Sequence, residues 1–187
     1  MKRSLASLFL ILFLVGLGIY FFTPLGPKVR GYAGRLWSKN AVALKTDRQV
    51  SEEAYGWQLT DTDGNPHGFA EAKGKVVFLN FWATWCGPCL KEMPDIQKLY
   101  NDYGDKVAFL LVTQEETAKV DTFLQKKEYT FPIYFTATGD IPEEIASKSM
   151  PTSYIIGKSG KIVRAETGAA NWNGSEVRAM LDGLLAE

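Results

Sequence analysis

The chain has 187 residues, with 21 Lys and Arg against 21 Asp and Glu, so its formal net charge at pH 7 is zero. A balanced charge gives no reason to expect a nucleic acid as partner, and none is predicted. Without its first 52 residues the chain keeps about 135, which suits one compact domain with its own core.

The N-terminus carries a long apolar segment, residues 5–22, after a short n-region, residues 1–4, that contains Lys2 and Arg3. A helix of this length spans about 27 Å, close to the roughly 30 Å of a bilayer core. No small-x-small cleavage site follows Phe22, and no lipobox cysteine is present. The segment is therefore predicted to be an uncleaved, single-pass transmembrane signal anchor. The alternative is a signal that is cleaved at a poor site.

Residues 23–52 are predicted to be a juxtamembrane linker. Part of it, residues 30–44, could form a short basic helix at the headgroups, and a plain spacer is an equally good interpretation. Positive charges follow the apolar segment closely, at Lys28, Arg30, Arg35 and Lys39. Counted alone, they favour a reversed orientation in the membrane.

The domain, residues 53–187, begins with an alternating segment, 54–60, that predicts a strand. Residues 61–66 are rich in turn formers, so a β-hairpin is expected. The acidic residues of this turn do not match an EF-hand loop, since position 72 is alanine. His67 is interpreted as a solvated loop residue. The apolar run Val76–Phe81 predicts a buried strand, and residues 90–100 are compatible with a helix.

The second half of the domain continues with alternating helix and strand signals. The expected elements are a strand at 106–113, a helix at 115–128, a strand at 131–135, a short helix at 141–147, a strand within 149–156, a turn at 157–161, a strand at 162–166, and a last helix capped by Asn173 or Ser175.

The two cysteines, Cys86 and Cys89, are the only ones in the chain and lie where the buried strand passes into a helix. A helix N-terminus stabilises a thiolate, which is the nucleophile in disulfide exchange. Cys86 is predicted to attack because it lies first, at the exposed end of the turn, and Cys89 to resolve the mixed disulfide. Pro88 suits the first helical turn, and Gly87 leaves room for a partner's backbone.

Other uses of a C-x-x-C pair fit less well. A zinc site needs more donors than two cysteines and one distant histidine, and haem attachment needs a histidine where this chain has Leu90. A purely structural disulfide would close a very short loop and remove little unfolded-state entropy. No metal or cofactor is therefore expected.

Residues 82–89, with the sequence Trp-Ala-Thr-Trp-Cys-Gly-Pro-Cys, closely resemble the thioredoxin active site. The wider run 78–94, with Asn80 and Glu92, resembles the membrane-tethered TlpA/ResA-type subgroup, and the resemblance covers about the last 135 residues. It implies an α/β, thioredoxin-like fold with a central mixed sheet flanked by helices. It also implies an N-terminal β-hairpin and a TlpA-type helix–strand insertion between positions 115 and 135.

The resemblance also implies supporting residues around the cysteines. Pro151 should follow a cis peptide bond, so that Met150 presents backbone groups to an extended partner peptide. Trp85 is expected to form a wall of the partner groove. Thioredoxin has an aspartate where this chain has Asn80, and an amide cannot carry protons. Glu92, one helical turn after Cys89, is the substitute candidate, and a solvated Glu92 remains the alternative.

The predicted function is that of a thiol–disulfide oxidoreductase that reduces disulfides of cell-envelope proteins. The resemblance implies a membrane thiol donor of electrons and a place on the bacterial inner membrane, with the redox domain on the extracytoplasmic side. It suggests the thiols of apocytochrome c, during cytochrome c maturation, as one substrate. The alternatives are a thiol oxidase or isomerase and a copper-binding dithiol chaperone, which would prefer a different cysteine spacing.

Overall fold

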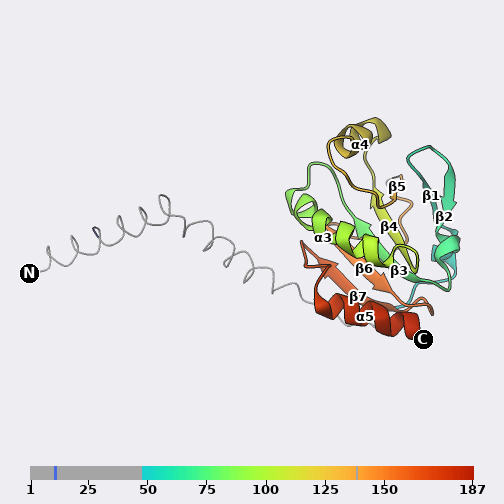
Figure 1. Cartoon of the computed structure of the whole chain (residues 1–187). Coiled ribbons are helices and arrows are strands. Elements are labelled where there is room, and N and C mark those ends of the chain that lie inside the picture. The colour runs from blue at the N-terminus through green and yellow to red at the C-terminus, as the bar shows by residue number, and fades with distance from the viewer. Residues whose placement is uncertain (1–10, 12–47, 138) are drawn as a thin grey trace, which may run out of the picture. The chain divides into compact units, whose positions relative to one another are not determined.

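The computed structural model of the chain describes residue 11, residues 48–137 and residues 139–187 (Figure 1). The predicted transmembrane segment, apart from Ile11, and the linker up to residue 47 lie outside the described residues. Within the described part, no helix combines the length and the apolar character needed to cross a membrane. The fold is therefore described for residues 48–187.

Seven strands, three α-helices and two 3-10 helices form this part of the chain. In chain order they are η2 (Glu53–Gly56), β1 (Gln58–Thr60), β2 (Pro66–Gly68), η3 (Phe69–Ala72), β3 (Val76–Phe81), α3 (Gly87–Tyr103), β4 (Val107–Thr113), α4 (Thr117–Leu124), β5 (Ile133–Phe135), β6 (Thr152–Ile156), β7 (Ile162–Thr167) and α5 (Ser175–Ala186).

The strands form one mixed sheet in the order β2-β1-β5-β4-β3-β6-β7. β3 pairs in parallel with β4 and antiparallel with β6, so it lies inside the sheet. Every residue of β3 is buried, which fits a strand that is apolar at every position except Asn80. The predicted α/β fold with a mixed sheet flanked by helices is confirmed. The segment between β4 and β6 adds α4 and β5, and β5 extends the sheet as a parallel neighbour of β4.

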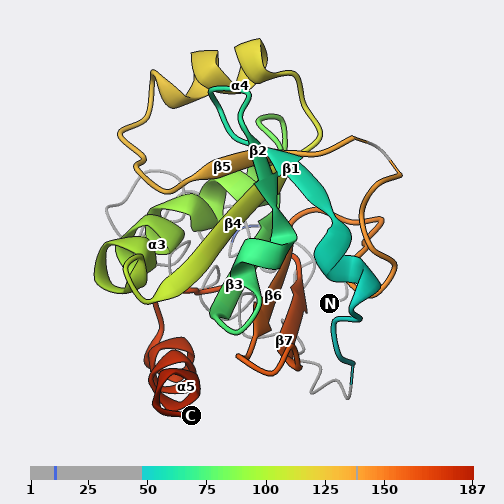
Figure 2. The same cartoon turned by 90° about the vertical axis from the view of Figure 1, so that its right-hand side faces the viewer.

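The two faces of the sheet carry separate cores because side chains alternate along β3. Val76 and Phe78 face α3 and α5, which lie on the same side of the sheet in Figure 2. Val77, Leu79 and Phe81 face the opposite core, which residues 50–72 and Ile145 complete. Asn80 has the same parity as Phe78, so β3 places one polar side chain beneath α3.

The start of the domain differs in part from the sequence prediction. Residues 53–56 form the 3-10 helix η2, and the strand begins only at Gln58, so the prediction of a strand from residue 54 is wrong. Ala54 is buried in the core on the face of the sheet opposite α3, and this burial favours a compact turn over an extended segment. The hairpin is confirmed, since β1 pairs antiparallel with β2. His67 lies in β2, not in a loop, and stacks on Tyr134 with ring centroids 4.6 Å apart.

Three helix predictions in the second half are also corrected. Residues 141–147 form a turn and no helix, since their backbone hydrogen bonds join residues only three positions apart. Ile145 is fully buried in the core on the face of the sheet opposite α3. α4 covers 117–124 and is shorter than predicted. The last helix begins after Gly174 without a side-chain cap, and Asn173 instead accepts hydrogen bonds from Arg178.

Candidate active site

The two cysteines lie at the N-terminus of α3, as predicted. Cys86 is the N-cap residue, with an extended backbone, and Gly87 is the first residue of the helix. The Cys86 Sγ atom accepts a hydrogen bond from the backbone N–H of Cys89, at 3.3 Å. The structure joins the two side chains in a disulfide, with Cα atoms 5.2 Å apart. The pair is therefore seen in its oxidised form, in a position where a helix N-terminus stabilises negative charge on sulfur.

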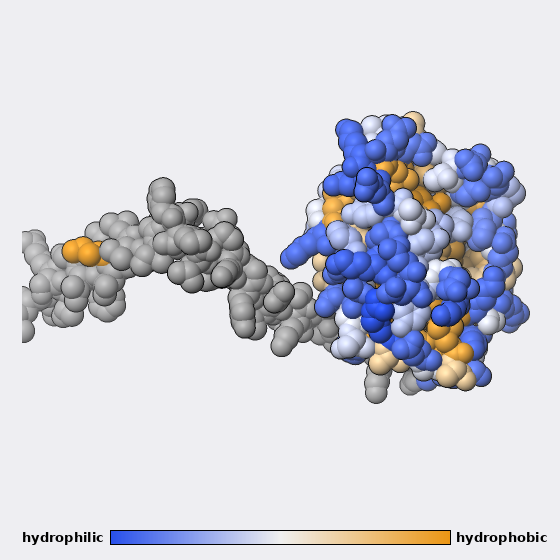
Figure 3. Space-filling view, in the orientation of Figure 1, coloured by the Kyte–Doolittle hydropathy of each residue, from blue (hydrophilic) through white to orange (hydrophobic). Residues whose placement is uncertain are grey.

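Neither cysteine is exposed in this oxidised form. The expectation that Cys86 lies at an exposed end of the turn is therefore wrong for the oxidised protein. The exposed fractions are 4% for Cys86 and 1% for Cys89, and both residues belong to the core cluster on the α3 side of the sheet. The surface beside them comes from exposed Gly87 and Pro88. Trp85, which is 67% exposed, is the large hydrophobic side chain that projects from the domain described here. The face of the domain drawn in Figure 3 is largely hydrophilic, with smaller hydrophobic patches in between.

The peptide bond between Met150 and Pro151 is cis, which confirms the prediction. Pro151 directly precedes β6, and its neighbour Thr152 pairs with Phe81 at the end of β3. Met150 packs against the same core cluster that contains both cysteines. The pairing of β6 with β3 thus brings the cis-proline segment to the carboxyl-terminal end of β3, where the loop that carries the cysteines begins.

Glu92 is buried beneath α3, with only 2% of its surface exposed. Its Oε1 accepts a hydrogen bond from the side-chain amide of Asn80, at 2.9 Å. Its Oε2 accepts two more, from the backbone N–H of Ala170 at 3.1 Å and from the indole N–H of Trp172 at 2.8 Å. The alternative of a solvated Glu92 is therefore wrong.

Burial raises the pKa of Glu92 to about 7 and outweighs the three hydrogen bonds, which favour the ionised form. The negative charge of Glu166 adds to the rise. Asn80 cannot exchange the proton, but it holds Glu92 and also donates to the hydroxyl of Ser153, at 2.7 Å. A carboxyl group one turn beyond Cys89 is thus poised to gain or lose a proton near neutral pH.

Comparison with known proteins agrees with this geometry. The family model for Redoxin matches residues 39–182. The chain belongs to the Redoxin family. It is 36% identical over 118 residues to thiol-disulfide oxidoreductase ResA of Bacillus thuringiensis subsp. konkukian, covering 62% of this chain and 68% of that protein. It is 34% identical over 160 residues to the thioredoxin-like protein YneN of Bacillus subtilis, covering 81% and 91%.

Among solved structures, one described as a thiol:disulfide interchange protein DsbE from Chlorobium tepidum superposes with a TM-score of 0.64 at 25% identity. The match covers 75% of this chain and 99% of that one. This Redoxin domain is therefore a ResA/TlpA-like member of the thioredoxin superfamily, and its enzyme class is thiol–disulfide oxidoreductase. This confirms the family and the activity class expected from the sequence.

Two supporting residues of this Redoxin site were not predicted from the sequence. Glu115, just after β4, accepts hydrogen bonds from the backbone N–H and the hydroxyl of Thr84, and it forms an ion pair with Lys119. Burial opposes the ionisation of Glu115, but the hydrogen bonds from Lys119 and Thr84 lower its pKa below the ordinary value. Because β3 and β4 run parallel, their carboxyl-terminal ends lie side by side. A residue just after β4, such as Glu115, can therefore reach the loop after β3, and parallel pairing is the feature that could have predicted this contact.

Trp172 is the second missed residue. It is fully buried, and its ring packs edge-on against Phe78, with centroids 5.0 Å apart. The sequence offers only a tryptophan before the last helix, and nothing local connects it to a glutamate 80 positions earlier. The tertiary fold alone makes this contact.

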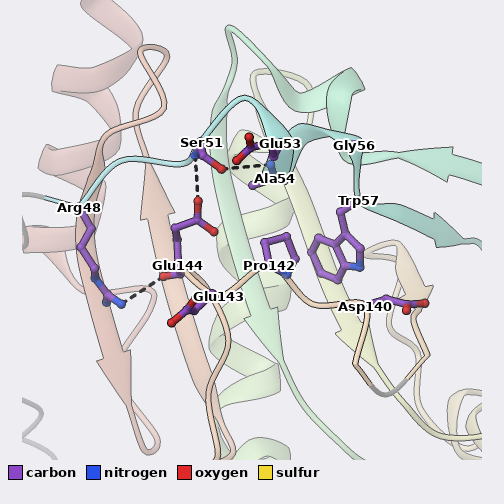
Figure 4. Close-up of a pocket in the computed structure, with 10 residues that line it drawn as sticks. All are labelled: Arg48, Ser51, Glu53, Ala54, Gly56, Trp57, Asp140, Pro142, Glu143 and Glu144. Carbon is purple, nitrogen blue, oxygen red and sulfur yellow. Dashed lines mark hydrogen bonds between the residues drawn. The ribbon is translucent and has the colours of Figure 1, made fainter.

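A separate cavity of about 830 Å³ lies on the opposite face of the sheet, where the 48–57 segment meets residues 140–144 (Figure 4). Glu144 forms part of the wall of this cavity. Its side-chain Oε1 accepts a hydrogen bond from the backbone N–H of Ser51, and its backbone oxygen accepts one from the side chain of Arg48. Neither cysteine and none of the predicted supporting residues lines this cavity. The redox chemistry therefore belongs to the surface around α3.

Proposed function

We propose that this oxidoreductase works as a reductase of disulfides in cell-envelope proteins, with Cys86 as nucleophile and Cys89 as resolving thiol. The observation that carries the proposal is the placement of the cysteine pair at the N-terminus of α3, one turn from a buried carboxyl group. Site roles are assigned here to Cys86, Cys89 and Glu92, with Trp85, Gly87, Pro88, Met150 and Pro151 forming the surface for the partner.

The reaction begins with the pair reduced. The Cys86 thiolate attacks one sulfur of the partner's disulfide, forms a mixed disulfide, and releases the other partner sulfur as a thiolate. Cys89 then loses its proton and attacks Cys86, which releases the second partner thiolate. The partner has gained two electrons, and the enzyme is left with the Cys86–Cys89 disulfide that the structure contains. A dithiol donor at the membrane is the reductant that restores the pair.

Glu92 is the group proposed to take the proton of Cys89. Both lie on the buried face of α3, one turn apart. A carboxylate can accept a proton where an amide cannot, so Asn80 holds Glu92 in place and leaves the proton transfer to it. Glu92 with a pKa near 7 is well matched to a proton transfer at neutral pH.

The test of the cysteine roles is trapping of the mixed disulfide in the full chain. Cys89→Ser is expected to accumulate a covalent adduct with a disulfide-containing peptide, while Cys86→Ser, its matched control, forms none. Turnover by Cys86→Ser, or adducts formed equally by both variants, would overturn the assignment.

The direction of electron flow is tested by the reduction potential. Equilibration against a dithiothreitol or glutathione couple should give a value near that of thioredoxin, about −270 mV. A value near that of a strong oxidant, about −120 mV, would instead establish the oxidase alternative.

We further propose that residues 5–22 anchor the chain in the inner membrane with the redox domain outside the cytoplasm, and that apocytochrome c is a substrate. The apolar length of this segment and the TlpA/ResA resemblance support the proposal. Protease added to intact spheroplasts should digest the domain, and protection of the domain would overturn the proposed orientation.

The apocytochrome c proposal is tested with peptides. An oxidised peptide with the haem-attachment pattern C-x-x-C-H should be reduced faster than a peptide in which the histidine is replaced. Equal rates would remove this substrate.

A further inference from the structure

Two buried carboxyl groups, Glu92 and Glu166, lie on the α3 side of the sheet. Strand pairing places Asn80, Ser153 and Glu166 side by side on three adjacent strands, since Asn80 pairs with Ser153 and Ser153 with Glu166. Directly paired residues point to the same face of a sheet. Glu166 is therefore on the α3 side, two strand spacings or about 10 Å from Asn80, the residue that holds Glu92.

Glu166 is 1% exposed and forms an ion pair with Arg164, from Nε to Oε2 at 3.1 Å. Its other oxygen, Oε1, has no hydrogen-bond partner among the described residues. Arg164 is itself buried, and its Nη1 lies 3.6 Å from the exposed Glu176. Charges that are removed from water in this way act on their neighbours over longer distances than surface charges do.

Arg164 also contacts the indole that holds Glu92. Its guanidinium carbon lies 5.4 Å from the centre of the Trp172 ring, in a cation–π arrangement. The N–H of the same indole donates to Glu92 Oε2 at 2.8 Å. The ion pair thus reaches Glu92 through the Trp172 ring. Glu166 is also the strand neighbour of Ser153, whose hydroxyl accepts a hydrogen bond from Asn80.

We propose that the Arg164–Glu166 ion pair is a positioning and charge-tuning device for the proton acceptor of the disulfide exchange. Arg164 fixes the ring of Trp172, and thereby the oxygen atom of Glu92 that receives the indole hydrogen bond. Glu166 supplies a negative charge that makes Glu92 hold a proton more tightly. This inference rests on the proposed role of Glu92 as the proton acceptor for Cys89.

The groups that face Glu92 make the inference specific. β3 contributes the neutral Asn80, the 168–174 segment contributes the donors Ala170 and Trp172, and on α3 the neighbouring cysteines are joined in a disulfide. Glu166 on β7 is the charged residue that raises the pKa of Glu92 from a distance. The strand register puts Glu166 about 10 Å from Asn80, which contacts Glu92, so the two carboxyl groups are separated by a distance of that order. At such a separation and an effective dielectric constant of about 20, a unit charge moves a pKa by roughly one pH unit.

The experiment is a titration of the Glu92 carboxyl group by carbon-13 NMR in the oxidised full chain, with Glu92→Gln used to assign the signal. Glu166→Gln removes a negative charge and leaves Arg164 in place, so the midpoint of Glu92 should fall by roughly one pH unit. Adding Arg164→Gln to Glu166→Gln removes the compensating positive charge as well. In this double variant the midpoint should return toward the wild-type value.

Glu176→Gln is the matched control, because it removes a carboxylate that touches the same arginine but is exposed to solvent; it should leave the midpoint unchanged. A midpoint that stays or rises in Glu166→Gln, or a double variant that deviates as far as the single one, would overturn the inference. The proposed role of Glu92 is judged separately, by the pH dependence of Cys89 reactivity in Glu92→Gln. If that profile equals the wild-type profile, the proton-acceptor role fails, whatever the NMR titration shows.

Discussion

Replacing Glu92 by glutamine should change how the stability of the protein depends on pH. The folded state raises the pKa of this carboxyl group from an ordinary value of 4.5 to about 7. Below pH 4.5 both the folded and the unfolded chain carry the proton. Between the two values the folded state holds the proton and the unfolded state does not, so stability falls as the pH rises.

The size of this effect follows from the two pKa values. Their difference of about 2.5 corresponds to about 3 kcal/mol, since each pH unit is worth about 1.4 kcal/mol. The free energy of unfolding of the wild type, relative to Glu92→Gln, should therefore decrease by about 3 kcal/mol between pH 4.5 and pH 7.5. Glutamine keeps the volume and cannot ionise, so other titrating groups cancel in the comparison.

The assay is denaturant unfolding of both proteins, oxidised, at closely spaced pH values from 4 to 8. Equal slopes with denaturant would show that both unfold to similar ensembles. A difference in unfolding free energy that is constant across this range, or that grows in favour of the wild type as the pH rises, would refute the argument that burial dominates the three hydrogen bonds.

Three further predictions concern the residues around the site. Trp172→Phe removes a hydrogen bond to Glu92, so it should cost about 1–3 kcal/mol more unfolding free energy at pH 8, where the carboxylate is ionised, than at pH 5; equal losses would contradict this. Trp85→Ala should keep stability within about 0.5 kcal/mol but slow mixed-disulfide formation, whereas the buried Trp82→Ala should cost about 3–5 kcal/mol, as measured by denaturant unfolding. Glu115→Gln should lower the free energy of unfolding more at pH 7 than at pH 3, because the lowered pKa of Glu115 adds stability only above the ordinary pKa of a glutamate. An equal effect of the control Glu116→Gln would show that the contact between Glu115 and Thr84 is unimportant.

The local chemistry of the site was readable from the sequence. The continuous apolar run of β3 predicts burial on both faces, and the cysteines that follow it are found at a helix N-terminus. The run is informative because a strand inside a sheet that is covered on both faces needs apolar side chains at nearly every position. One prediction that fails, a helix at 141–147, concerns a short segment with a fully buried Ile145.

Local sequence signals and the family resemblance were enough to predict the reactive pair, its strand-to-helix setting and the cis bond before Pro151. The proton affinity of Glu92, the carboxyl group beside that pair, could not be predicted in this way. Glu92 is held by Trp172 from 80 positions away and tuned by Glu166 across three strands. A pKa depends on burial and on the distances to charges and donors, and these exist only once distant segments of the chain have packed together.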